Sequence, residues 1–317
     1  MISQIKLLYR SKQFIQEFWK CRNSNIKFYN FWNYASLDDM WFYIYLRDRL
    51  KIKDSKKTIA FYSCLNDILF TKIFKADINI FFTGESHSRL GKFNDSFFER
   101  MDINLGFKED DLDNYLRHPL WIHYLFKPES SYDDIKKVLQ NIQNTKVDFD
   151  KRRFCSHVSS WDPQGIRFKM INHLNTVQVV DCGGKFNNNT NSLKQEFGDR
   201  KIDFLANYKF NICPENINEK DYVTEKIFQA FQARTIPIYW GGDKRPESEV
   251  LNSDSYIYFD DLISSPVDLD RIINLNTNKE MYMDFMHQSI FKSSAAEYIQ
   301  DKFEQLDNKL IQLMNNL

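Results

Sequence analysis

The sequence has few cysteines, no long apolar run and no excess of charge of either sign. Its five cysteines stand at positions 21, 64, 155, 182 and 213, without a CxxC pair. An odd, scattered set of this kind favours a reducing compartment over a disulfide framework, so we expect a cytoplasmic protein. The first 20 residues lack the apolar run of a signal peptide, and no later stretch approaches the ~18 apolar residues of a membrane span. We therefore expect no transmembrane segment.

Charge and ring content narrow the class of protein further. The 43 Lys and Arg residues are balanced by 43 Asp and Glu residues, so no overall field attracts nucleic acid or an anionic membrane. Any anion site must therefore be built locally. Glycine and proline are scarce, at 9 and 7 residues, whereas aromatic residues make up 16% of the chain. Most of these rings are expected in cores, and some exposed Tyr or Trp side chains are candidates to pack against sugars.

The hydrophobic pattern predicts an α/β protein, and 317 residues favour two domains. Short aromatic and β-branched segments predict strands at 26–32, 57–64, 77–82, 151–159, 176–181, 208–213, 235–242 and 255–261. Helices are predicted at 38–50, 163–174, 192–206, 224–234 and over the last 24 residues, and the stretch 131–153 is predicted to be a helix followed by a linker. This alternation indicates a parallel sheet in each half, with ligands at the carboxyl ends of the strands. We place the boundary between domains 1–149 and 150–317.

The segment 211–243 combines turn residues and charges in a pattern that suits a nucleotide. A strand leads into Pro214-Glu215-Asn216, and Thr224 precedes a helix whose first turn carries Glu225 and Lys226. A helix N-terminus and a lysine favour phosphate, and a carboxylate can accept two hydrogen bonds from a ribose diol. Alternatively, Thr224 is only an N-cap and Glu225 and Lys226 form a solvated pair.

The same segment resembles a known family. Residues 208–212 (YKFNI), 215–216 (EN), 222–226 (YVTEK) and 236–241 (IPIYWG) follow the order and spacing of the donor-binding signature of glycosyltransferase family 10, the α-1,3/4-fucosyltransferases. The resemblance extends upstream through Arg167 and residues 180–184 (VDCGG), and weakly through 81–85 (FFTGE). Bacterial members without a membrane stem are the most similar.

This resemblance implies the GT-B architecture, in which two Rossmann-like domains with parallel sheets face a central cleft. Domain 1–149 would lie on the acceptor side and domain 150–317 would bind the donor, with the final helix a candidate to pack back on the first domain. The implied reaction transfers L-fucose from GDP-L-fucose, with inversion, to a hydroxyl of GlcNAc or glucose in a glycan, through an α-1,3 or α-1,4 linkage. GDP-L-fucose is then a substrate, no cofactor is required, and a divalent metal is not expected to be essential. Two alternatives stay open: a GT-B transferase for another nucleotide sugar, and a catalytically silent glycan- or nucleotide-binding module.

The resemblance also implies roles for individual residues. Donor binding falls to Asn216, Tyr222, Glu225 and Lys226, with Glu225 on the ribose and Lys226 on the diphosphate. Arg167 is implied at the phosphates as well. The two cations would neutralise the charge that develops on the departing GDP.

Glu85 matches the proposed catalytic base of the family. A base of this kind removes the acceptor proton while the donor sugar loses GDP. Without the resemblance, a solvated turn carboxylate would be preferred for Glu85. His87, two residues further on, is a candidate acceptor contact or an ordinary surface histidine.

Metal-binding patterns are weak. Asp111-Leu112-Asp113 has the spacing of a metal motif but lies in an acidic segment, and we interpret it as surface charge. His118 and His123 are five residues apart, not the four that align side chains on a helix, so no zinc site is expected.

Overall fold

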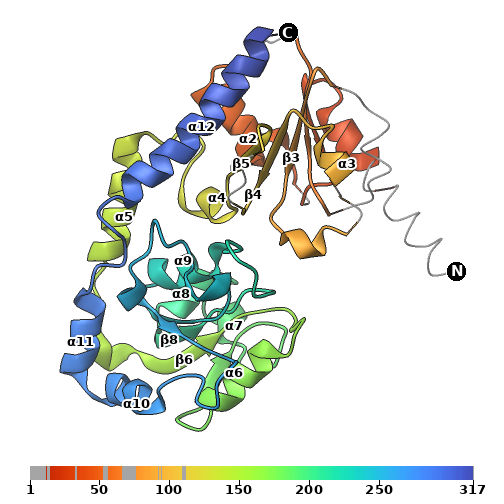
Figure 1. Ribbon diagram of the computed structural model, residues 1–317. Helices are drawn as coiled ribbons and strands as arrows, with labels where there is room; N and C mark the ends of the chain where they lie inside the picture. The colour runs from red at the N-terminus through yellow and green to blue at the C-terminus, as the bar shows by residue number, and fades with distance from the viewer. Residues whose placement is uncertain are drawn as a thin grey trace, which may run out of the picture. The chain divides into compact units, whose positions relative to one another are not determined.

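The computed structural model describes residues 12, 15–32, 34–52, 56–65, 76–91, 93, 95–108 and 112–316. Contacts within the chain separate two compact units, Met1–Ser131 with Gln300–Leu317, and Tyr132–Ile299. Each unit contains a five-stranded sheet in which all neighbouring strands are parallel (Figure 1). The prediction of an α/β protein with a parallel sheet in each half is confirmed. Asp111 and the first 11 residues lie outside the described part of the chain.

The sheet of the first unit has its strands in sequence order. They are β1 (Ile26–Tyr29), β2 (Ile59–Tyr62), β3 (Ile78–Phe82), β4 (Ile103–Gly106) and β5 (Tyr115–Arg117). Side chains alternate between the two faces of a strand, so successive rings of β3 enter different layers. The Phe81 ring lies 5.4 Å from Phe93, whereas Phe82 lies 5.1 Å from Phe42.

Short helical segments cover this sheet. They are η1 (Leu37–Asp39), α2 (Trp41–Ile44), η2 (Tyr45–Arg49), η4 (His87–Arg89), α3 (Asp95–Phe98) and α4 (Trp121–Leu125). The single helix predicted at 38–50 is thus a 3-10 turn, an α-helical turn and a π-helical turn in succession. The C-terminal helix α12 (Ala295–Asn316) adds Asp307, whose carboxylate accepts hydrogen bonds from Arg49 Nη2 at 2.8 Å and from the Tyr45 hydroxyl. From Gln300 onward, α12 therefore belongs to the first unit.

The sheet of the second unit has the order β10-β9-β8-β6-β7. Its strands are β6 (Arg153–His157), β7 (Val180–Cys182), β8 (Tyr208–Ile212), β9 (Ile236–Tyr239) and β10 (Ile257–Tyr258). After β6 the chain forms β7 on one side of it and β8 on the other, so the topology reverses between β6 and β8. Loops at the carboxyl ends of such a pair leave room for a ligand.

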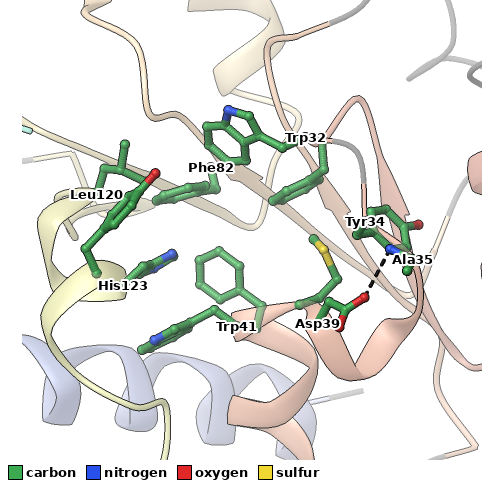
Figure 2. Close-up of a pocket in the computed structure, with 12 residues that line it drawn as sticks. Trp32, Tyr34, Ala35, Asp39, Trp41, Phe82, Leu120 and His123 are labelled. Carbon is green, nitrogen blue, oxygen red and sulfur yellow. Dashed lines mark hydrogen bonds between the residues drawn. The ribbon is translucent and has the colours of Figure 1, made fainter. Parts of the chain in front are cut away.

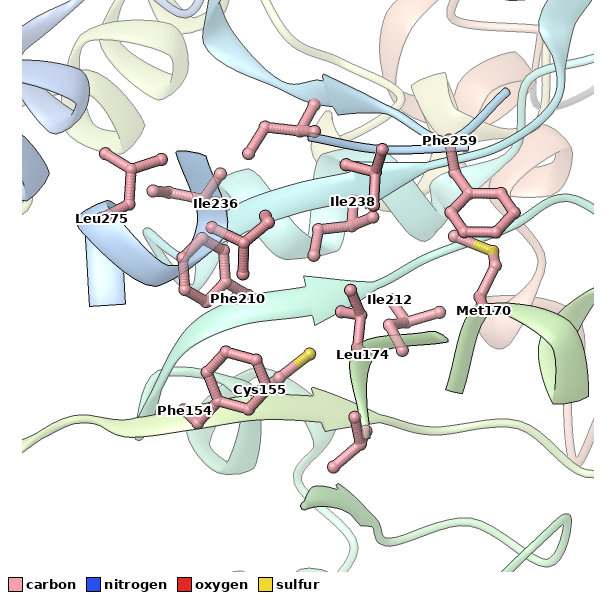
Figure 3. Packing of buried hydrophobic residues seen from close by; sticks show 14 of the residues in the cluster. Phe154, Cys155, Met170, Leu174, Phe210, Ile212, Ile236, Ile238, Phe259 and Leu275 are labelled. Carbon is pink, nitrogen blue, oxygen red and sulfur yellow. The ribbon is translucent and has the colours of Figure 1, made fainter. Parts of the chain in front are cut away.

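Helices pack against this sheet and form a core with it. They are α5 (Tyr132–Asn144), α6 (Ile166–Leu174), α7 (Ser192–Gln195), α8 (Lys201–Leu205), α9 (Glu225–Gln232), α10 (Leu269–Thr277) and α11 (Lys279–His287). Phe210 of β8, Ile238 of β9 and Met170 of α6 lie in one buried cluster (Figure 3). These strands are short apolar segments because helices cover the sheet.

Three further details differ from the sequence prediction. Strands β4 and β5 were not predicted, because each is only three or four residues long and lies in a segment without a clear period. The helix predicted at 192–206 is broken into α7 and α8 by Gly198 and Asp199, whose φ angles are 57° and 64°. The strand predicted to begin at 176 begins at Val180, because Thr176 and Val177 form a turn after α6.

Candidate functional site

A buried carboxylate organises the loop between β8 and α9. Glu215 is completely buried, and its Oε1 accepts hydrogen bonds from the Thr224 backbone N–H at 2.8 Å and the Tyr239 hydroxyl at 3.3 Å. Its Oε2 accepts from the Thr224 hydroxyl at 2.7 Å and from Lys226 Nζ at 2.9 Å. Gly241 has a φ of 127°, and a Cβ there would lie 2.8 Å from Glu215 Cγ, so glycine permits the close approach. Glu215 thereby fixes the start of α9.

The N-terminus of α9 differs from the simple N-cap of the alternative interpretation. Thr224 occupies the N-cap position, but its side chain makes no capping hydrogen bond to the helix. Its hydroxyl instead donates to Glu215 and accepts a hydrogen bond from Lys226 Nζ at 2.8 Å. Lysine has three N–H donors, so Lys226 has one further donor for a ligand.

The charges at this helix start reinforce one another. Burial opposes the charge of Lys226, but Glu215 and Glu225 outweigh it and hold the pKa of the ammonium group above its usual range. Burial likewise opposes ionisation of Glu225, but Lys226 and Lys201 outweigh it and lower the pKa of that carboxyl. Both groups are therefore charged near neutral pH, as binding of a phosphate and a diol requires.

Arg167 and Asn216 are brought together from positions 49 residues apart in the sequence. Arg167 Nη2 donates to Asn216 Oδ1 at 2.8 Å, and Arg167 Nη1 donates to the carbonyl oxygen of Trp161. Arg167 is almost fully buried, at 2% exposure. Asp162 orients the start of α6 by accepting from the backbone N–H of Arg167 at 3.2 Å and of Phe168 at 2.9 Å. The two predicted donor residues therefore form one partly buried contact, in which Arg167 is buried and Asn216 half-buried.

Tyr222 is also buried, at 1% exposure. Its backbone N–H donates to the carbonyl oxygen of Glu219 at 3.2 Å, in a turn where Asp221 has a φ of 64°.

A polar cavity of about 670 Å³ lies at the carboxyl ends of β6 and β7. Its lining comes from the loops after both strands and from the region of α7 and α8: Val158, Ser159, Ser160, Gly183, Gly184, Lys185, Asn188, Thr190, Asn191, Leu193, Lys194, Asp199 and Lys201. Lys201 Nζ donates to Gln229 Oε1 of α9 at 2.7 Å. Burial lowers the pKa of Lys201, and Glu225 partly counters this effect. The cavity wall therefore adjoins the helix that carries Glu225 and Lys226.

A buried histidine contacts one residue of the cavity lining, Ser159, and a glycine belongs to the lining itself. His157 Nδ1 lies 2.9 Å from the carbonyl oxygen of Ile212, and His157 Nε2 lies 2.8 Å from Ser159 Oγ. Burial lowers the pKa of His157 to about 4, so the ring is neutral near pH 7. A Cβ on Gly184 would lie 2.2 Å from the carbonyl oxygen of Ser159, so only glycine allows the two loops to meet.

In the first unit, Glu85 follows the carboxyl end of β3. Its backbone N–H donates to Thr83 Oγ1 at 3.0 Å, and the Thr83 hydroxyl donates to the Glu85 carbonyl oxygen at 2.9 Å. The carboxylate accepts from Arg89 Nη1 at 3.0 Å, and about a third of each side chain is exposed. The carboxylate is therefore both accessible and oriented, as a base must be. His87 is exposed in the same loop, and its ring lies 5.6 Å from that of Phe98.

His118 and His123 meet despite their spacing of five residues. Their Nε2 atoms are 3.1 Å apart, and burial lowers the pKa of His118 to about 3. Within the described ranges, no group of three or more His, Cys, Asp or Glu side chains could hold a metal ion.

Among the helices that the structure describes, none has the length and apolar character to cross a membrane.

Sequence reasoning assigned no role to Glu215 or Lys201. Glu215 was part of the motif, and its position two residues beyond Cys213, at the end of an apolar strand segment, was the available signal. Lys201 stands in an ordinary charged segment (GDRKIDF), and no local pattern distinguishes it.

Two family profiles match the chain. Glycosyltransferase family 10 (fucosyltransferase) C-term matches residues 148–309, and Alpha-(1,3)-fucosyltransferase FucT N-terminal domain matches residues 26–124.

Individual relatives are similar over part of their length. Alpha-(1,3)-fucosyltransferase FucT of Helicobacter pylori is 30% identical over 235 residues, which cover 66% of this chain and 46% of the relative. Human 4-galactosyl-N-acetylglucosaminide 3-alpha-L-fucosyltransferase 9 is 26% identical over 144 residues, covering 45% of this chain and 38% of the relative. The chain thus spans less than half the length of these curated relatives. A crystal structure of alpha1,3-fucosyltransferase with GDP-fucose superposes with a TM-score of 0.58 at 25% identity, covering 89% of each chain.

Proposed function

Because the chain belongs to glycosyltransferase family 10, the fucosyltransferases, we propose that it transfers L-fucose from GDP-L-fucose to a glycan hydroxyl. The acceptor sugar is GlcNAc or glucose in this proposal, the linkage is α-1,3, and the configuration at the fucose carbon is inverted. The observation that carries the proposal is the hydrogen-bonded start of α9. There Glu215 holds Thr224 and Lys226 at a helix N-terminus.

The start of α9 suits the diphosphate of GDP. Helix N-termini offer N–H groups and positive potential to phosphates, and Lys226 adds a full charge with a donor left for an oxygen. Arg167 is the second cation in this proposal. Because it is buried and bonded to Asn216, its contact with the diphosphate requires the Asn216 side chain to move when the donor binds.

The nucleoside is proposed to occupy the cavity at the ends of β6 and β7. Glu225 stays ionised and can accept both hydrogen bonds of a ribose diol. The volume of about 670 Å³ lies within the ~300–1,000 Å³ typical of small-molecule sites. Tyr222, which is buried just before α9, is proposed to contribute to donor binding.

Glu85 is the proposed catalytic base. The acceptor O–H bond breaks as Glu85 takes the proton, the oxygen bonds to the fucose anomeric carbon, and the bond from that carbon to the phosphate oxygen breaks. GDP leaves with the electron pair, and Arg167 and Lys226 stabilise its negative charge. These cations supply the charge stabilisation, so we propose that neither a cofactor nor a divalent metal is required. His87 is proposed as an acceptor contact.

Calorimetry and an acceptor assay test the function. GDP-fucose should bind, and mass spectrometry should find fucose added to a GlcNAc-containing oligosaccharide, with or without EDTA. Tighter binding and transfer of another nucleotide sugar, such as GDP-mannose or UDP-GlcNAc, would replace the proposed donor.

Two variants test the roles. Glu85→Gln should abolish transfer and keep donor binding, because the amide cannot accept the proton. Lys226→Ala should weaken GDP binding, whereas the exposed Lys151→Ala in the same unit should not. Transfer by Glu85→Gln at the wild-type rate would remove Glu85 from catalysis.

A cytosolic location stays a prediction, supported by the five free thiols.

A further inference from the structure

A second cavity lies in the first unit, at the carboxyl ends of β1 and β3 (Figure 2). It has a volume of about 420 Å³. Phe31 and Trp32 follow β1, and Phe82 is the last residue of β3. A Cβ on Gly84 would lie 2.9 Å from the Trp32 ring, so this glycine lets the indole lie against the loop after β3. The next residue in that loop is Glu85.

The lining is mostly aromatic. It consists of Phe31, Trp32, Tyr34, Ala35, Asp39, Met40, Trp41, Phe42, Phe82, Leu120, His123 and Tyr124. His123 is stacked between Trp41, at 4.3 Å, and Phe82, at 4.7 Å, which makes one wall rigid. Trp32 and Tyr124 are unusually exposed for large rings, at 42% and 53%. Flat exposed rings of this kind match the C–H face of a sugar ring.

One carboxylate, that of the exposed Asp39, is part of the lining. Asp39 Oδ2 accepts from the backbone N–H of Ala35 at 3.0 Å (Figure 2) and from the backbone N–H of Ser36 at 2.8 Å. These bonds fix the carboxylate and leave Oδ1 to accept a hydrogen bond from a hydroxyl group. The negative charge of this carboxylate disfavours a phosphate, which it repels. The described lining residues include no Lys or Arg to offset that repulsion.

Resting on the proposed function, we infer that this cavity binds a pyranose ring of the acceptor glycan beside Glu85. Trp32 and Tyr124 pack against the C–H face of the sugar, and Asp39 accepts a hydrogen bond from one of its hydroxyls. The cavity volume lies within the range of ~300–1,000 Å³ found for small-molecule sites. Acceptor affinity is therefore determined in the first unit by residues outside the donor-binding signature.

Steady-state kinetics with a GlcNAc-containing oligosaccharide test this inference. Trp32→Ala should raise the acceptor KM about tenfold, the factor that corresponds to about 1.4 kcal/mol of lost contact. GDP affinity and the hydrolysis of GDP-fucose by water should stay at wild-type values. The acceptor KM of Trp32→Phe should fall between those of wild type and Trp32→Ala, because this variant keeps a ring against Gly84. Trp19→Ala, which removes another exposed indole of the first unit, is the matched control and should change nothing.

Asp39→Asn provides a second variant that keeps the shape of the side chain. It should raise the acceptor KM with kcat nearly unchanged, because Asp39 touches no reacting atom. An acceptor KM unchanged in both variants, while GDP-fucose still binds and is transferred, would overturn the cavity assignment alone. Inhibition by an alkyl detergent but not by free GlcNAc would overturn it as well. If GDP-fucose does not bind the wild-type protein, the proposed function itself fails.

Discussion

Replacing Glu215 by glutamine tests whether this carboxylate builds the proposed donor site. Each carboxylate oxygen accepts two hydrogen bonds: Oε1 from the Thr224 N–H and the Tyr239 hydroxyl, and Oε2 from the Thr224 hydroxyl and Lys226. Glutamine has the same shape but only one oxygen. If its NH2 group takes the Oε1 position, it faces the Thr224 N–H; if it takes the Oε2 position, it faces the Lys226 ammonium. Neither of these groups can accept a hydrogen bond, so both orientations leave a conflict between donors.

The cost follows from burial. An unsatisfied buried donor costs about 1–3 kcal/mol, and breaking a buried ion pair costs about 3–5 kcal/mol. Lys226 keeps 18% of its side chain exposed, so water recovers part of this loss. We therefore expect Glu215→Gln to lower the unfolding free energy of the second unit by about 2–4 kcal/mol. GDP affinity should fall with it, because Lys226 and the start of α9 lose their anchor.

The assay measures amide hydrogen exchange and GDP binding over a range of pH. Exchange of amides in β8 and α9 reports on the second unit alone, and calorimetry reports on GDP. The raised pKa of Lys226 contributes stability below its ordinary value of 10.5, and this contribution is lost as the pH rises through the higher folded value. The difference in unfolding free energy between wild type and Glu215→Gln should therefore shrink above that pH. The exposed Glu249→Gln is the control. If Glu215→Gln shows the same amide exchange and the same GDP affinity as the control Glu249→Gln, the role of Glu215 is refuted.

Three further predictions follow from the same structure. His157 has a pKa of about 4 in the folded protein and 6.5 in the unfolded chain, so the unfolded chain binds more protons between these pH values. The unfolding free energy should therefore fall as the pH drops from 6.5 to 4. His157→Gln should reduce this dependence of the unfolding free energy on pH, as measured by urea titration. Gly184→Ala places a Cβ 2.2 Å from the backbone oxygen of Ser159 and should cost about 1–3 kcal/mol in urea unfolding; an unchanged midpoint would mean that the loops separate freely. Arg89→Ala removes the 3.0 Å contact that orients Glu85 and should lower kcat several-fold, whereas GDP affinity should stay unchanged. Arg89→Lys should restore part of the lost kcat. A wild-type kcat in Arg89→Ala would contradict this positioning role.

Much of the fold could be predicted because its signals are local. Strands β3, β8 and β9 are short apolar segments with turn residues after them, and their buried positions bear out that pattern. Charged and turn residues of the donor motif lie within a few positions of one another, so Glu225 and Lys226 could be assigned to one helix start. Strand β5 has only three residues and gave no such signal.

The sequence by itself determined the α/β class and the family resemblance, and it indicated the residues of the proposed donor motif, because periodicity and motif spacing act over short stretches of chain. Only the tertiary structure decided that Glu215 joins the ends of β8 and β9 to α9, that His118 meets His123, and that Trp32 lies on Gly84. Such contacts depend on which strands pair and how loops pack, and burial then makes them strong by excluding water. No local pattern encodes that pairing.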